Sequence, residues 1–202
     1  MDLGYGQVVT PWRRGVLAGA AALALAGSVV ACSGAGATTT MAAPSATSAA
    51  AGPDLRPKGE TVADVPIIRV VDGDTVHVLV SGQETTVRLV GINTPETVKP
   101  DSPIECFGPE ASAYAKKMLT DRQVTLEFDA SQGRTDQYGR TLAYVWRQLP
   151  EGGLRLFNLE AVAGGYAQER QYGPTPYAWK NAFRSAQASA RKGNLGMWGA
   201  CR

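Results

Sequence analysis

Short runs of β-branched and other apolar residues recur between turn-forming residues from residue 66 onward. The turns Asp-Gly-Asp and Ser-Gly-Gln separate the first three runs, a pattern typical of strands joined in a meander. Two further runs follow, one with strict alternation of apolar and polar positions. The pattern therefore predicts five strands, over residues 67–71, 75–80, 85–90, 123–129 and 142–146.

Three other segments place apolar residues at helical spacing. The first begins at Pro109, a residue suited to a first helical position, and runs to Leu119. The second covers residues 157–163, and the third runs from about residue 176 to residue 192 and ends at Gly193. Five strands with a helix between the third and fourth is the order of an OB-fold, a small barrel that often binds oligonucleotides. We therefore expect a mainly β, α+β fold: a five-stranded OB-fold barrel with three α-helices.

The N-terminal region has a different character. Arg13 and Arg14 precede an uncharged, mostly apolar run over residues 15–31, which is typical of a secretory signal peptide. A small residue then precedes Cys32, an arrangement that resembles a bacterial lipobox. We expect residues 1–31 to be a signal peptide and Cys32 to carry a lipid. The alternative is an ordinary signal peptide or an uncleaved anchor with an incidental cysteine.

Residues 33–64 consist mostly of Ala, Ser, Gly, Thr and Pro. Such a segment buries too little apolar surface to offset the entropy of ordering it, so a flexible linker is expected here. One globular domain is then predicted over residues 65–202. The chain as a whole is expected to be a monomer outside the cytoplasm, lipid-anchored to a bacterial cell membrane and partly secreted.

The amino-acid composition excludes several classes of binding site and mechanism. The 202 residues carry a net charge of +2, which argues against a polybasic nucleic-acid coat but allows a local basic cleft. The single histidine, His77, excludes any mechanism that needs two histidines, including histidine-ligated zinc sites, and is given no role. There are three cysteines. If Cys32 carries a lipid on an exported chain, Cys106 and Cys201 remain as a disulfide pair, the alternative being two free thiols.

Oxygen-bearing side chains gather at the expected rim of the meander. Asp74 begins the second strand, while Asn93, Thr94 and Glu96 follow the third. The start of one strand and the end of its neighbour lie at the same rim of a meander. Donors that are all oxygen suit calcium or magnesium rather than zinc.

Two arginines supply the complementary charge. Arg88 lies in the third strand and Arg140 follows a turn containing glycine. Two fixed guanidinium groups can hold one phosphate through forked hydrogen bonds. Phosphoryl transfer depends mostly on charge stabilisation and an oriented nucleophile, so a cation, two arginines and a carboxylate would suffice without histidine. Arg134 and Asp136, in the same loop as Arg140, are expected to pair with each other and stabilise the turn.

Five ordered motifs resemble the staphylococcal nuclease (thermonuclease) family over about residues 66–198. They occupy residues 71–76, 87–97, 108–113, 127–129 and 134–144. The resemblance implies an OB-fold barrel with three helices and a calcium-dependent nuclease that acts on single-stranded or flexible DNA and RNA. It also implies products with 3′-phosphate and 5′-hydroxyl ends.

The resemblance assigns roles to particular residues. Arg88, Glu96 and Arg140 match the family's catalytic arginine, carboxylate and second arginine. Asp74 matches a carboxylate ligand of calcium and Thr94 a backbone-carbonyl ligand. Tyr138 and Tyr172 match tyrosines beside the substrate phosphate and the nucleotide.

Two positions depart from the family pattern. Asn93 stands where the type member has a second calcium-binding aspartate, and Gln137 stands where it has a lysine that contacts phosphate. Asn93 still offers an oxygen, but one negative charge fewer predicts weaker calcium binding. The alternative function is a catalytically inactive OB-fold lipoprotein that binds nucleic acid or protein. Scaffold members of the family lack the arginine–carboxylate set, which is present here.

Overall fold

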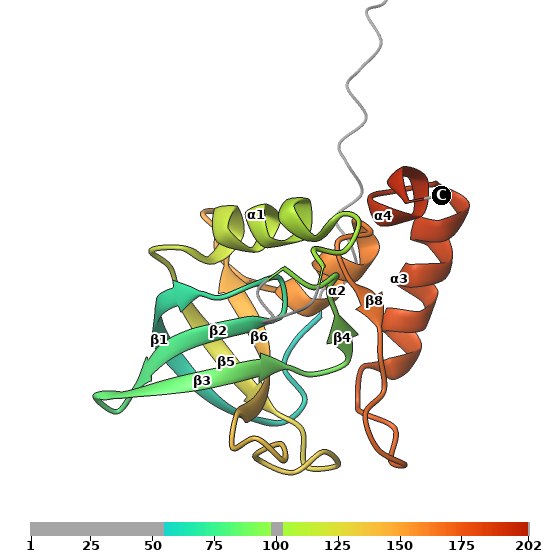
Figure 1. Cartoon of the computed structure of the whole chain (residues 1–202). Coiled ribbons are helices and arrows are strands. Elements are labelled where there is room, and N and C mark those ends of the chain that lie inside the picture. The colour runs from blue at the N-terminus through green and yellow to red at the C-terminus, as the bar shows by residue number, and fades with distance from the viewer. Residues whose placement is uncertain (1–54, 98–102, 202) are drawn as a thin grey trace, which may run out of the picture. The chain divides into compact units, whose positions relative to one another are not determined.

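The computed structural model of the chain describes residues 55–97 and 103–201 (Figure 1). The predicted signal peptide, the predicted lipidation site Cys32 and most of the predicted linker lie outside the described residues. Within the two described ranges, no helix is both long enough and apolar enough to cross a membrane.

Five strands form a closed barrel, which confirms the predicted fold class. They are β1 (Glu60–Val70), β2 (Thr75–Val80), β3 (Gln83–Leu89), β5 (Gln123–Phe128) and β6 (Thr141–Gln148). Their order is β3-β2-β1-β5-β6, with antiparallel neighbours throughout. A parallel pairing of β3 with β6 closes the sheet, and β7 (Leu154–Leu156) extends it from β6. The closure brings residues 88 and 142 into register, far apart in sequence but adjacent at one rim.

Three helices pack around the barrel as predicted. They are α1 (Gly108–Leu119), α2 (Phe157–Ala163) and α3 (Lys180–Lys192), and a single turn, α4 (Met197–Ala200), follows. Figure 1 shows α1 across one end of the barrel and α3 at its side. The third helix begins four residues later than predicted; in the segment before it, the Ala178 backbone N–H donates to Asp129 Oδ2 and the side chains of Tyr177 and Trp179 are buried.

Two short strands, β4 (Ile92–Asn93) and β8 (Gln168–Glu169), form a separate antiparallel pair. At two residues each they show no periodicity in the sequence, and they were not predicted. This pair joins the end of the third barrel strand to the segment that precedes α3.

The core fills the barrel interior with residues from every barrel strand. The larger fully buried side chains include Trp146, Tyr144, Phe157, Phe183 and Leu126. Along β2 and β5, buried apolar positions follow the strand pattern from which these elements were predicted.

The linker prediction is wrong at its C-terminal end, because β1 begins at Glu60. Residues 60–62 pair with residues 126–128 of β5. The two residues before the strand are also held, since the backbone N–H groups of Lys58 and Gly59 donate to the buried carboxylate of Glu127. The order of this segment therefore comes from its partners and not from its own composition.

Cys106 and Cys201 form the expected disulfide. It joins Cys106, two residues before α1, to the residue just after α4, across 95 positions of sequence. The bond thus ties the chain's last described residue to the loop that follows β4.

Candidate active site

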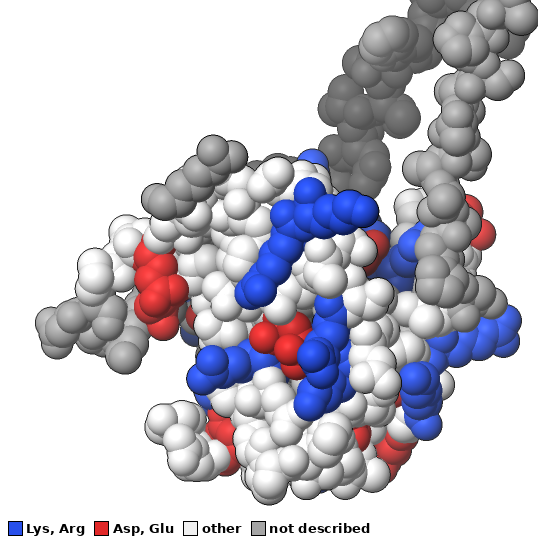
Figure 2. Space-filling view, turned by 90° about the vertical axis from the view of Figure 1, so that its right-hand side faces the viewer, with Lys and Arg blue, Asp and Glu red and all other residues white. Residues whose placement is uncertain are grey.

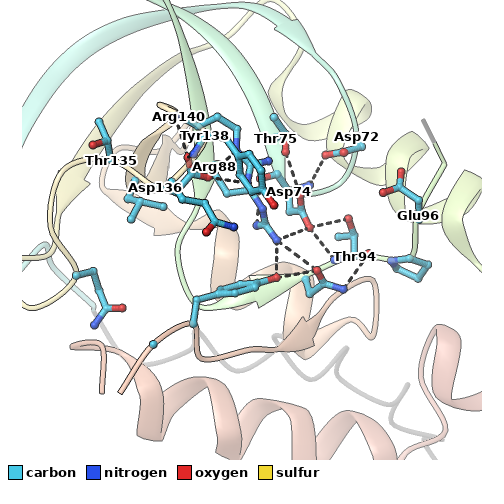
Figure 3. Close-up of a pocket in the computed structure, with 17 residues that line it drawn as sticks. Asp72, Asp74, Thr75, Arg88, Thr94, Glu96, Thr135, Asp136, Tyr138 and Arg140 are labelled. Atoms are coloured by element: carbon cyan, nitrogen blue, oxygen red, sulfur yellow. Dashed lines mark hydrogen bonds and ion pairs between the residues drawn. The ribbon is translucent and has the colours of Figure 1, made fainter. Parts of the chain in front are cut away.

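All eight residues expected at the catalytic, metal and substrate positions line one cleft of about 660 Å³ at the barrel rim. Figure 3 shows Arg88 and Asp74 in the middle of the cleft, Glu96 to one side, and Arg140 and Tyr138 to the other. The eight are Asp74, Arg88, Asn93, Thr94, Glu96, Tyr138, Arg140 and Tyr172. The start of β2, the end of β3, β4, the loop before β6 and the segment after β8 each contribute to this lining.

Arg88 is buried and rigidly held. It is the penultimate residue of β3 and lies opposite Thr75 of β2. Its Nη1 donates to the backbone carbonyls of Leu89, at 2.9 Å, and Ile92, at 3.0 Å. Its Nη2 faces the cleft and lies 3.1 Å from Asp74 Oδ2. A cation fixed in this way can receive an anion with little loss of side-chain entropy.

The expected calcium donors lie together beside Arg88. The Asp74 carboxylate accepts hydrogen bonds from the Thr94 backbone N–H, at 2.8 Å, and from its hydroxyl, at 3.1 Å. Asn93 Nδ2 donates to the Thr94 carbonyl oxygen at 3.3 Å, and Asn93 Oδ1 accepts from Arg88 Nη2 at 3.3 Å. Thus the Asp74 carboxylate, the Asn93 amide oxygen and the Thr94 carbonyl form one patch of oxygen atoms.

This donor set fits a hard cation such as calcium, but with few charges. Among residues 55–97 and 103–201 there is no cluster of three His, Cys, Asp or Glu side chains that could hold a metal ion. A cation here would therefore depend on the amide and carbonyl oxygens of Asn93 and Thr94 as well as on Asp74. The close contact of Gly73 with Thr94 supports the patch, because a Cβ at Gly73 would lie 2.5 Å from Thr94 Cγ2.

Asp72 also lines the cleft and was not among the expected site residues. Its Oδ1 accepts a hydrogen bond from the Asp74 backbone N–H. Burial and the neighbouring Asp74 carboxylate raise the pKa of Asp72 to about 6. The signal for it in the sequence was its position two residues before Asp74 in the same turn. A cation bound beside Asp72 and Asp74 would offset the repulsion that the Asp74 carboxylate exerts on the Asp72 carboxylate.

Glu96 occupies the other side of the cleft from Arg140 (Figure 3). Its Oε1 accepts from the Thr97 backbone N–H at 2.8 Å. The Glu96 backbone donates to Glu105 Oε2 and accepts from the Glu105 N–H, each at 3.0 Å. Because Glu105 adjoins the disulfide-bonded Cys106, the carboxylate stands on an anchored segment.

Arg140 is held by Asp136, and the expected pairing of Arg134 with Asp136 is wrong. Asp136 Oδ2 accepts from Arg140 Nε and Nη2, both at 2.6 Å. Arg134 instead pairs with Glu60 at the start of β1. Partial burial opposes ionisation of Asp136, but hydrogen bonds from the Arg140 backbone, the Arg140 side chain and the Tyr138 backbone lower its pKa below the ordinary value. Asp136 therefore stays ionised and orients Arg140.

The two tyrosines differ in how they are held. Tyr172 OH donates to Asn93 Oδ1 at 2.8 Å and accepts from Arg88 Nη2 at 3.0 Å. Tyr138 is 74% exposed, with its ring 5.3 Å from the Arg140 guanidinium carbon. Exposed aromatic rings next to arginines are suited to stacking on bases. Gln137, which stands where the family pattern has a lysine, lines the cleft as well.

Comparison with known proteins extends these observations. A family model described as staphylococcal nuclease homologue matches residues 86–200. The thermonuclease of Staphylococcus hyicus is 40% identical over 132 residues, covering 65% of this chain and 73% of that protein. The thermonuclease of Staphylococcus intermedius is 42% identical over 130 residues, covering 64% and 73%. Endonuclease YncB of Bacillus subtilis is 34% identical over 138 residues, covering 67% and 61%.

Proposed function

Since the chain belongs to the family of staphylococcal nuclease homologues, we propose that it is a calcium-dependent nuclease that hydrolyses DNA and RNA outside the cytoplasm. Relatives named thermonuclease and endonuclease support the nuclease activity. The observation that carries the proposal is that two held arginines, Arg88 and Arg140, and the carboxylate of Glu96 line one cleft.

The chemistry divides among these residues. Arg88 and Arg140 would bind the non-bridging oxygens of a phosphodiester and stabilise the negative charge that grows there during attack. Glu96 would orient a water molecule and accept its proton. The water oxygen bonds to phosphorus, the bond from phosphorus to the 5′ oxygen breaks, and that oxygen takes up a proton. The products then carry 3′-phosphate and 5′-hydroxyl ends.

Asp74, Asn93 and Thr94 would hold the calcium ion. When bound, calcium supplies positive charge next to the phosphate and lowers the cost of the charged transition state. With a single carboxylate in this set, calcium affinity is expected to be modest. Tyr138 and Tyr172 would contact a flexible or single-stranded substrate, whose bases are free to stack.

The proposed location outside the cytoplasm is supported by the N-terminal sequence and is compatible with the disulfide. The apolar run before Cys32 supports export and lipid anchoring of a monomer to a bacterial membrane. The Cys106–Cys201 bond suits an oxidising compartment.

The test is a cleavage assay on end-labelled single-stranded DNA with purified protein, in millimolar calcium and in excess chelator. We expect cutting in calcium only, and products with 3′-phosphate ends. Arg140→Ala should abolish cutting, whereas Arg122→Ala, an exposed arginine outside the cleft lining, should not. A folded protein that binds DNA without cutting it in calcium would overturn the proposal and favour the inactive binding module.

A further inference from the structure

The domain is nearly neutral overall, but acidic and basic residues are unevenly distributed between its two parts. Residues 61–160 contain ten Lys and Arg against fourteen Asp and Glu. Residues 161–201 contain five Lys and Arg against one carboxylate, that of Glu169. The acidic barrel is therefore followed by a basic C-terminal region, whose principal element is α3.

Three of these cations form a stripe along α3, which contains no acidic residue. At about 3.6 residues per turn, Lys180, Arg184 and Arg191 fall within about 40° of one another around the helix axis. At ~1.5 Å per residue they extend over about 16 Å. We call these three residues the basic stripe. Figure 2 shows the side of the domain that α3 covers, where Lys and Arg side chains gather around a small acidic patch.

In the part of the chain that the structure describes, the side-chain partners found for the basic stripe are neutral groups. Within the described residues, none of its members forms an ion pair. Lys180 donates to the neutral Gln171 side chain, and Arg191 lies 4.2 Å from the Trp198 ring. Glu169, the one carboxylate of the region, accepts from Tyr177 OH. A solvated helix face ordinarily mixes both signs of charge, whereas the charged residues of α3 itself are all cations.

The stripe begins beside the active-site cleft. Lys180 Nζ lies 2.6 Å from the side-chain oxygen of Gln171, the residue before Tyr172. Arg170 lies 5.8 Å from the Tyr172 ring, and Tyr172 lines the cleft. Further along α3, Gln187 accepts from the Glu169 backbone N–H of β8. Thus a strand leaving the cleft past Tyr172 would meet the stripe next.

We propose that the basic stripe binds the sugar–phosphate backbone of the nucleic-acid strand whose scissile bond lies in the cleft; this rests on the proposed nuclease function. A length of about 16 Å is enough to contact several successive phosphates of one strand, one for each cation of the stripe. The contacts are to phosphates, so they add affinity without sequence preference. The stripe favours long substrates over short ones, because only a long strand reaches from the cleft to Arg191.

The test compares a stripe variant, Lys180→Gln with Arg184→Gln and Arg191→Gln, against a control variant of equal charge change, Lys116→Gln with Lys117→Gln and Arg122→Gln. The control residues are exposed and lie near the C-terminal end of α1, away from α3. Binding of a 20-nucleotide single strand is measured by fluorescence anisotropy in chelator at 50–200 mM salt. Because nothing is cut, this result is independent of the nuclease activity.

Three lost phosphate contacts should reduce the slope of log affinity against log salt by about 2. The wild-type protein should then lose about 15-fold more affinity than the stripe variant between 50 and 200 mM salt. The control variant should keep the wild-type slope, and Arg184→Lys with Arg191→Lys should keep it too. In calcium, the stripe variant should raise KM for the 20-mer and leave KM for a trinucleotide unchanged.

Equal slopes for the stripe and control variants would overturn the proposal, since the effect would then come from net charge alone. An equal rise in KM for both substrate lengths would overturn it as well. The proposal would also be overturned if the stripe variant kept the wild-type salt dependence of DNA binding but no longer bound vesicles containing phosphatidylglycerol. The surface would then be specific for lipid.

Discussion

Glu127 provides the sharpest test of how the barrel, the N-terminal segment and α3 are held together. Its side chain is 1% exposed, and each oxygen accepts two hydrogen bonds. Oε1 accepts from the backbone N–H groups of Lys58, at 2.6 Å, and Gly59, at 3.0 Å. Oε2 accepts from the indole N–H groups of Trp146, at 2.7 Å, and Trp179, at 3.2 Å.

Glu127→Gln replaces one oxygen with an NH₂ group that faces two donors. Two hydrogen bonds are lost, and the two that remain are no longer assisted by charge. Hydrogen bonds to charged groups contribute about 1.5–3 kcal/mol each, so we expect the free energy of unfolding to fall by about 3–5 kcal/mol. For a domain with a total stability of about 5–15 kcal/mol this is a large fraction.

Urea unfolding followed by circular dichroism measures the change. With a slope of about 1–3 kcal/mol per molar urea, the midpoint should fall by about 1 M or more. Glu84→Gln is the control, because Glu84 is an exposed partner of His77, and it should change stability by less than about 0.5 kcal/mol. A Glu127→Gln protein within 0.5 kcal/mol of wild type would refute the reasoning that this carboxylate carries four needed hydrogen bonds.

Three further predictions follow from the same structure. Asn93→Asp should tighten calcium binding in a calorimetric titration by about tenfold, because it restores a charged oxygen to the patch; unchanged or weaker binding would contradict this. Thiol labelling of the folded, non-reduced protein should not modify Cys106 or Cys201, and replacing both with serine should lower stability by up to ~4–5 kcal/mol in the loop-entropy model. Although burial opposes ionisation of Asp129, hydrogen bonds from Ala178, Tyr144 and Ser131 lower its pKa. The stability it contributes is therefore present above the ordinary carboxyl pKa of ~3.9 and lost as the pH falls below it, so Asp129→Asn should flatten the acid limb of a stability–pH curve.

Most of the barrel could be predicted because its signals are local. The second helix has the predicted bounds, 157–163, since apolar spacing and two closing glycines lie within the segment itself. The first half of β1 could not be predicted in this way. Residues 60–64 are mostly polar and exposed, and their order depends on backbone pairing with β5 and on the Glu127 carboxylate, both distant in sequence.

In the candidate site, too, some features could be predicted from the sequence and others depend on distant partners. Motif spacing was enough to expect Arg88, Glu96 and Arg140 in one place, and all three line the cleft. The ion-pair partners of Arg134 and Arg140 could not be predicted from the sequence. Arg134 reaches Glu60, 74 positions away, because the start of β1 pairs with the end of β5, from which the loop holding Arg134 continues; this leaves Asp136 to hold Arg140.

The most direct test of the account is single-turnover cleavage of a single-stranded oligonucleotide in saturating calcium by wild-type protein and by Glu96→Gln. The substitution keeps the size of the side chain and removes the group that would accept the proton of water. We expect cleavage to slow by about 10²–10³-fold, by analogy with the loss of one transition-state contact, while affinity for the oligonucleotide in chelator stays within about twofold of wild type. Cleavage by Glu96→Gln at the wild-type rate would contradict the assignment of this cleft as the catalytic centre.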